Sequence, residues 1–218
     1  MPVPEPVITR LFPRTIEEGQ YLEDLAIFAA RRCRTTKNTE ELWKEVDGYS
    51  SQKKRRFLDA VVYEEWALDV LEMLPIHYDV MNVPVWLIIE LLRHRLIWRD
   101  FSMEQMSQRA IPANRLQVRV PEPFEDLVAG YLAEAVEIIK VNPDMLPEDF
   151  RAVFPQGVIV NLVIAGNIRA FQHYFFMRCS EEMGGAGGAH PLFMKIADEM
   201  LLQASDVYPA SVTKVAKA

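Results

Sequence analysis

The sequence predicts a protein of mixed helices and strands, and three observations support that class. Apolar residues recur at helical spacing in long segments, of which residues 17–33 and 124–140 are the clearest. Residues 116–120 instead alternate between apolar and polar side chains, as does a strand with one covered face. Residues 157–165 are an apolar run, interrupted only by Asn161, with the length and β-branched content of a buried strand.

Local signals predict the other elements in chain order. We expect a long helix over residues 52–74, which Pro75 ends, and then a strand over residues 76–83. A helix that is apolar nearly all round should follow at residues 85–92. Two further helices are expected over residues 167–179, with Asn167 as N-cap, and over residues 191–204.

The two ends of the chain differ from the rest. Residues 1–15 contain four prolines, so we expect an extended arm that either frays or docks on a neighbour. Residues 209–218 are small and contain lysine, and we expect a flexible tail. No repeat or boundary is visible between them, so residues 16–208 are expected to form a single domain, which the family resemblance described below would make the catalytic domain.

Composition limits the classes of partner. The chain has 218 residues and a net charge of −7, with 31 acidic and 24 basic side chains, so its overall field repels nucleic acid and anionic lipid. The basic segments at residues 30–37 and 53–56 leave nucleic-acid binding as a distant alternative. The most apolar stretch, residues 83–92, is too short to cross a bilayer. Two distant cysteines, Cys33 and Cys179, favour a reducing compartment, so we expect a cytoplasmic protein with no membrane partner.

Six arginines stand beside apolar sequence, where a guanidinium needs a carboxylate or a phosphate because it cannot lose its charge. They are Arg93, Arg95, Arg109, Arg151, Arg169 and Arg178. Obvious buried acids are fewer. An acidic protein that gathers cations in this way is expected to bind an anionic small molecule.

Metal and nucleophile chemistry have little support in the sequence. The four histidines, His77, His94, His173 and His190, stand apart, with no partner at the spacing of metal ligands, so we expect no metal site. We interpret each cysteine as a buried apolar residue rather than as a reactive thiol.

Several motifs together resemble the flavin-dependent thymidylate synthase family. RHR at residues 93–95 is followed by FSMEQMSQR at residues 101–109, and Pro84 stands nine residues before Arg93. LPEDFR ends at Arg151, and NIRAFQHYFFMR covers residues 167–178. The similarity extends from about residue 66 to residue 180, and the motifs are specific as a set.

The resemblance implies an α+β subunit, with a central sheet flanked by helices, in a homotetramer whose active sites lie at subunit interfaces. It also implies FAD as cofactor, methylenetetrahydrofolate as one-carbon donor to uracil C5, and NADPH as reductant. The residues that it assigns to FAD are Glu72, Arg93, His94, Arg95, Asn167, Arg169 and His173. Those that it assigns to the uridylate are Glu90, Arg93, Gln105, Met106, Ser107, Gln108, Arg109, Arg151 and Arg178. Arg178, which would polarise the uracil ring, and Ser107 are the catalytic candidates.

Departures from the family pattern cluster near the nucleotide. Residues 96–99 are added after RHR, the usual tyrosine after Ser-x-Arg is Ala110, and the histidine upstream of Glu72 has no match. A roomier pocket resembles a divergent branch that methylates UMP in polyoxin-type nucleoside antibiotic synthesis, so we favour UMP over dUMP. An ordinary thymidylate synthase acting on dUMP, and a member that binds flavin or nucleotide without turnover, stay open.

Overall fold

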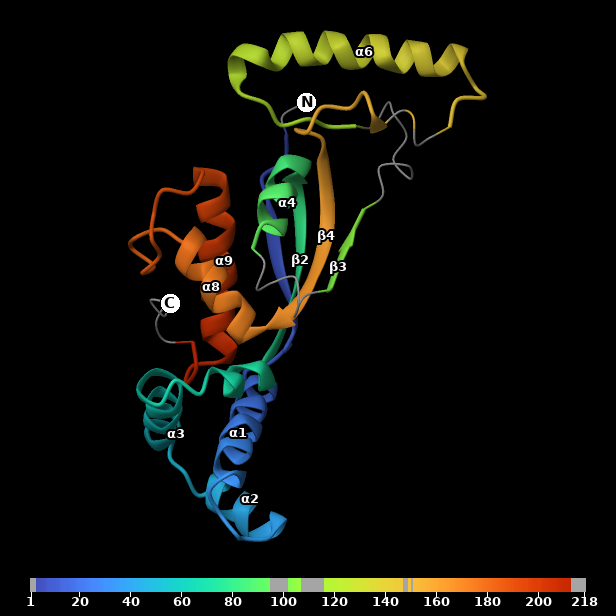
Figure 1. Ribbon diagram of the computed structural model, residues 1–218. Coiled ribbons are helices and arrows are strands. Elements are labelled where there is room, and N and C mark those ends of the chain that lie inside the picture. Colours follow the sequence, from blue (N-terminus) through green and yellow to red (C-terminus); the bar gives the residue numbers. More distant parts are fainter. Residues whose placement is uncertain (1–2, 95–101, 107–115, 147–148, 150, 213–218) are drawn as a thin grey trace. The chain divides into compact units, whose positions relative to one another are not determined.

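Four segments of the chain form one sheet, in the order β1-β2-β4-β3 (Figure 1). The strands are β1 (Val7–Phe12), β2 (Pro75–Pro84), β3 (Ser102–Gln105) and β4 (Ile159–Asn167). The computed structural model describes residues 3–94, 102–106, 116–146, 149 and 151–212, with the side chains of residues 102–105 left out. Helices accompany the sheet, and the predicted α+β class is confirmed.

The chain divides into two compact units. The first consists of Met1–Val7, Val80–Arg93 and Met103–Val163, and the second of Ile8–Asp79, His94–Ser102 and Ile164–Ala218. None of the helices in the described part of the chain has the length and apolar character that crossing a membrane requires.

Two helices of the second unit begin at strong N-caps. Thr15 and Asn38 each form a capping box, with Glu18 at α1 (Ile16–Arg32) and with Glu41 at α2 (Thr39–Asp47), which satisfies N–H groups that a helix start leaves open. The predicted helix over residues 17–33 is therefore confirmed. The sequence analysis missed α2.

The predicted continuous helix over residues 52–74 is wrong in extent, because regular helix ends at residue 64 and a separate short helix follows. α3 (Ser51–Asp59) passes into a π turn at Ala60–Glu64, and a 3₁₀ helix, η2, follows at Leu68–Met73. Between these turns Trp66 has a φ of 58°, a left-handed conformation that ends a right-handed helix. The apolar residues still recur at nearly helical spacing, because each of these segments buries apolar side chains in the core. This spacing led to the prediction of one helix.

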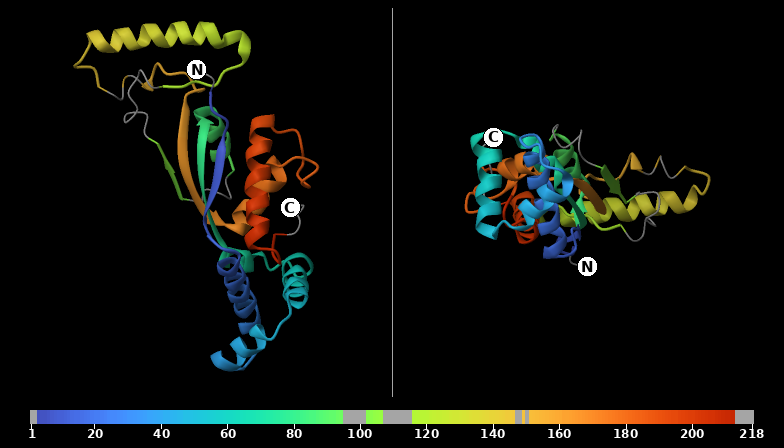
Figure 2. Two further views of the ribbon diagram at one scale, coloured as in Figure 1. Left: turned by 180° about the vertical axis from the view of Figure 1, so that it is seen from behind. Right: turned by 90° about the horizontal axis from the view of Figure 1, so that it is seen from below.

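Two further helices of the second unit, α8 (Ile168–Arg178) and α9 (Pro191–Val207), pack side by side (Figures 1 and 2). Both confirm predicted helices. α1 also packs on α9, and Gly19 makes this approach possible because a Cβ there would lie 2.0 Å from the carbonyl oxygen of Val207. The hydroxyl of buried Tyr78 donates to the carbonyl of Met200 at 2.7 Å, which ties β2 to α9.

The first unit contains α4 (Val85–Leu92), a short 3₁₀ turn at Glu122–Phe124 and α6 (Glu125–Val141), so the two predicted helices there are confirmed. The predicted buried strand forms as β4, shifted by two residues. The predicted strand at residues 116–120 is wrong in extent, since its only pairing within the described residues is an isolated bridge between Val118 and Val158.

Both expected terminal segments contain ordered structure. β1 forms within the expected arm, and in the second unit the Arg10 guanidinium donates to the carbonyl of Gln203 at 2.6 Å. At the other end, Ala210, Ser211 and Val212 are buried. The carboxylate of Glu23 accepts hydrogen bonds from both backbone N–H groups of Ala210 and Ser211 and from the Ser211 hydroxyl, at 2.8–2.9 Å. The tail is thus held on α1 as far as residue 212.

Glu23 makes stability depend on pH. Burial raises the pKa of its carboxyl from 4.5 to about 7, against the lowering effect of its hydrogen bonds. The folded protein therefore binds this proton more tightly than the unfolded chain does. Its contribution to stability is fully present below the unfolded pKa and is lost as the pH rises through the folded pKa.

We expect the free energy of unfolding to fall between about pH 5 and about pH 8, by up to about 3 kcal/mol from this group. Glu23→Gln keeps a neutral acceptor and should remove this part of the decline, whereas the exposed Glu17→Gln should keep it. Urea denaturation at the two pH values measures both. Equal pH dependence in the wild type and Glu23→Gln would contradict the assignment.

Candidate active site

The first turn of α8 is fixed at two points in the second unit. The backbone N–H of Ile168 donates to the carbonyl of Leu74 at 2.9 Å, directly after η2. The side-chain oxygen of Asn167 accepts the N–H of Ala170 at 3.0 Å, as predicted for an N-cap. These two bonds fix the start of α8 and therefore the direction in which its charged side chains project.

Arg169, one residue into the helix, forms an ion pair with Glu72 of η2. Both side chains are about half exposed, so the pair is in contact with solvent as well as with each other. The structure therefore brings together two residues that are 97 positions apart and that the sequence analysis assigned to the same ligand.

A second group of residues lies around His94. The Nε of Arg178 donates to Nε2 of His94 at 2.7 Å. The His94 ring meets the rings of His173 and Tyr174 edge-on, with centroids 6.0 and 5.6 Å away. The guanidinium carbon of Arg178 lies 4.7 Å from the centroid of the Phe193 ring, a cation–π contact. We call these five residues the His94 cluster.

The other predicted site residues lie either in the first unit or outside the described residues. Glu90 and Arg93 form an ion pair at 3.0 Å, three residues apart. The N–H of Met106 donates to the carbonyl of Asn161 at 2.8 Å, and Arg151 is exposed. Four more predicted residues lie outside the described residues: Arg95, Ser107, Gln108 and Arg109. For Gln105, the structure describes the backbone but not the side chain.

Comparison with known proteins identifies the family. A family model described as thymidylate synthase complementing protein, Thy1, matches residues 16–210. The chain belongs to this family. It is 28% identical over 164 residues to the flavin-dependent thymidylate synthase of Mycobacterium avium (strain 104), and the match covers 65% of this chain and 62% of the relative. The match therefore spans less than two thirds of that relative's length.

Two solved structures share the fold of this Thy1 member. One is the UMP/dUMP methylase PolB from Streptomyces cacaoi bound with 5-Br dUMP, with a TM-score of 0.68, 17% identity and coverage of 95% of this chain and 93% of that one. The other is thymidylate synthase X from Helicobacter pylori with FAD and dUMP, with a TM-score of 0.66, 16% identity and coverage of 97% and 100%.

The Thy1 member has a cysteine next to the His94 cluster, and its chemistry is that of a buried thiol. Burial raises the pKa of Cys179 well above its usual range, and Asp198 beside it raises the pKa further. The thiol is therefore protonated at neutral pH and is a poor nucleophile. No group of three or more metal-ligating side chains occurs in the part of the chain that the structure describes.

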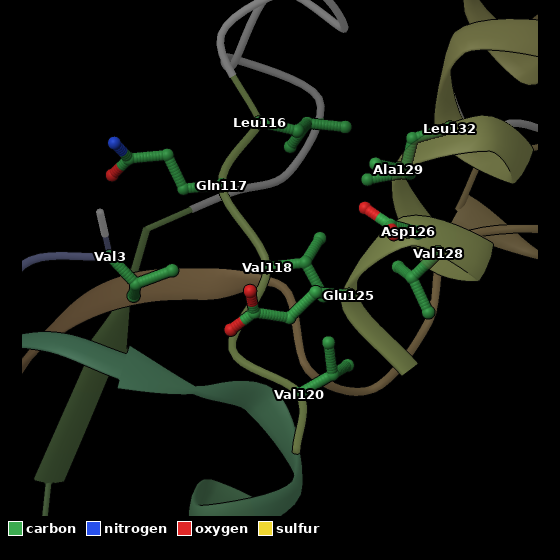
Figure 3. A pocket seen from close by; sticks show the side chains of 10 residues that line it. All are labelled: Val3, Leu116, Gln117, Val118, Val120, Glu125, Asp126, Val128, Ala129 and Leu132. Carbon is green, nitrogen blue, oxygen red and sulfur yellow. The ribbon is translucent and has the colours of Figure 1, made fainter. Parts of the chain in front are cut away.

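A cavity of about 560 Å³ in the first unit does not suit a nucleotide (Figure 3). Valine, leucine and alanine side chains form most of its lining, and Glu125 and Asp126, at the start of α6, add two carboxylates. These carboxylates repel a phosphate, whereas the His94 cluster presents a guanidinium and imidazole rings. The cations of the second unit are therefore the better candidate site for an anionic ligand.

The sequence analysis missed the two aromatic members of the cluster. Tyr174 and Phe193 are buried and serve as the ring surfaces against which His94 and Arg178 lie. Their spacing in the sequence is that of ordinary core residues on α8 and α9. Only the packing of these helices shows that Phe193 contacts Arg178.

We expect Asn167→Ala to lower the free energy of unfolding by about 1 kcal/mol, because the first turn of α8 loses its cap. Asn167→Asp keeps an oxygen acceptor at the helix start and should hold near wild-type stability. Chemical denaturation measures both variants. An Asn167→Ala protein as stable as the wild type would show that the cap does not hold the helix.

Proposed function

We propose that this protein methylates C5 of a uridylate in an FAD-dependent reaction, with methylenetetrahydrofolate as one-carbon donor and NADPH as reductant. The observation that carries the proposal is the oriented guanidinium of Arg178, on the helix that also presents Arg169 and His173. Membership of the Thy1 family supports it, as do relatives named flavin-dependent thymidylate synthases. The two free cysteines, Cys33 and Cys179, fit a reducing cytoplasm as its location.

The donors around α8 fit FAD. Guanidinium and imidazole N–H groups suit the pyrophosphate and carbonyl oxygens of such a cofactor, and Glu72 holds Arg169 in place. FAD, when bound and reduced, supplies the hydride that completes the methyl group. We assign to it Glu72, Arg93, His94, Arg95, Asn167, Arg169 and His173.

At the nucleotide, the protein positions the substrate and stabilises charge. In this proposal Arg178 donates to a uracil carbonyl and stabilises the negative charge that develops as C5 becomes nucleophilic. Arg109 and Arg151 hold the phosphate and the base, and Ser107 is the second catalytic candidate. The full set assigned to the uridylate is Glu90, Arg93, Gln105, Met106, Ser107, Gln108, Arg109, Arg151 and Arg178.

We propose UMP as the preferred substrate over dUMP. Ala110 stands where the family has tyrosine, and the smaller side chain leaves more room beside the nucleotide. The name of PolB, a UMP/dUMP methylase with the same fold, adds support. A preference for UMP would suit nucleoside antibiotic synthesis, and a preference for dUMP would suit the making of DNA precursors.

Purified protein should be yellow with FAD and should convert UMP, and dUMP less well, to a 5-methyl product when given methylenetetrahydrofolate and NADPH. Mass spectrometry in parallel assays of the two nucleotides measures product. A thermal shift with nucleotide but no product would instead favour a binding protein without turnover. Protein that stays colourless after reconstitution with FAD would overturn the proposal.

We further propose that the chain forms a homotetramer with active sites at subunit interfaces. α6 supports self-association, because its exposed apolar side chains Leu127, Tyr131, Ile138 and Val141 follow a helical spacing of three to seven residues. Leu127 and Val141 are 70% and 75% exposed. Apolar stripes of this kind on a helix usually mark an interaction surface.

Light scattering should give a mass of about four times the 25.1 kDa chain. The double variant Leu127→Glu, Ile138→Glu should lower that mass, since it places charges in an apolar interface. Glu134→Gln, a neutral change on the same helix, should leave it unchanged. A wild-type protein with the mass of one chain would rule out the tetramer.

A further inference from the structure

His94 and Arg178 belong to different predicted ligand sets, yet they contact each other directly. The resemblance assigns His94 to the cofactor and Arg178 to the nucleotide, and the two side chains are joined by a hydrogen bond of 2.7 Å. His94 is 6% exposed, so the imidazole side of this bond is buried. A buried bond to a charged group is among the stronger hydrogen bonds in proteins.

The direction of the bond fixes the protonation of the imidazole. The Nε of arginine carries a hydrogen and can only donate, so Nε2 of His94 must accept through its lone pair. A neutral ring that accepts at Nε2 carries its proton on Nδ1. His94 can then act on a ligand only as a donor, through Nδ1.

The same bond fixes the guanidinium of Arg178. Its Nε is held by His94, and its plane is supported by the Phe193 ring, 4.7 Å away. The other donors of the side chain are the four N–H bonds on its two terminal nitrogens. These are the donors of the planar fork that contacts two oxygens at once.

We propose that His94 is a positioning residue for Arg178, and that it links the cofactor half of the site to the nucleotide half. This inference rests on the proposed function. A ligand that fixes the orientation of the His94 ring also fixes the orientation of the Arg178 guanidinium. FAD and uridylate therefore strengthen each other's binding. Such coupling is reciprocal, and the nucleotide must raise the affinity for FAD by the factor by which FAD raises that for the nucleotide.

Two substitutions of similar polarity separate the ring nitrogens of His94. The amide of His94→Gln reaches about as far as Nε2 and can accept from Arg178, whereas the shorter amide of His94→Asn matches Nδ1. With FAD at saturation, we expect His94→Gln to keep the Kd for UMP within about threefold of wild type and His94→Asn to raise it roughly tenfold. Equal Kd values for the two variants, or the opposite ranking, would overturn the inference.

A double-mutant cycle tests the link to Arg178 itself. His94→Asn should raise the Kd for UMP in the wild-type background but add less than about twofold in an Arg178→Ala background, since the partner is already gone. Additive losses would overturn the inference. FAD affinity of each variant is measured separately from flavin fluorescence. Circular dichroism of each variant establishes that it is folded.

Met177→Leu is the matched control, because Met177 is exposed and adjacent to Arg178 on α8, and it should leave both affinities unchanged. Nucleotide binding by FAD-loaded wild-type protein distinguishes a failure of the proposed function from a failure of the role of His94. If FAD-loaded wild-type protein binds neither UMP nor dUMP, the proposed function fails. If it binds UMP and the variants behave additively, the proposed function stands and the role of His94 fails.

Discussion

The first turn of α8 is the constraint on which the candidate site depends. Its backbone is tied to η2 by the bond from Ile168 to Leu74, its start is capped by Asn167, and its first charged side chain pairs with Glu72. A helix is stiff and rises 1.5 Å per residue, so fixing its start also fixes Arg178, roughly 14 Å further along. Arg169 and Arg178 thus keep a set separation along α8.

The far end of α8 is held by packing rather than by charge. Phe171, Tyr174 and Phe175 form a chain of ring contacts with centroids 5.5 to 6.1 Å apart, and Tyr174 continues it to Phe193 on α9. Rings buried in this way have few alternative positions, because protein interiors are close-packed. Arg178 lies against Phe193 and His94 against Tyr174, so the core of the second unit limits the motion of both side chains.

Periodicity and end signals sufficed to predict most of the helices, but not the segment between residues 52 and 74. Apolar spacing depends on which side chains are buried, and α3, the π turn and η2 bury theirs at nearly helical intervals. Nothing in that pattern reveals the left-handed backbone of Trp66, whose side chain is 69% exposed. Tertiary structure overrides local preference there, as it does where residues 116–120 pair through only one bridge.

The sequence predicted residue types for the candidate site but not the contacts between them. Arginines beside apolar sequence indicated an anionic ligand, and the motifs indicated which arginines belonged together. The pairing of Arg169 with Glu72 needs the fold, since 97 residues separate them, and so does the contact of His94 with Arg178. Sequence spacing carries no information on such long-range contacts when only one sequence is at hand.

The partners of the arginines differ in a way that bears on substrate binding. Arg169 and Arg93 each face a glutamate, and a carboxylate neutralises the charge that it orients. In its 2.7 Å bond, Arg178 donates to the imidazole of His94, which is neutral because its Nε2 accepts. This bond orients the guanidinium and adds no negative charge beside it. In the role proposed for Arg178, stabilising developing negative charge, this neutral partner orients the guanidinium without itself adding a negative charge.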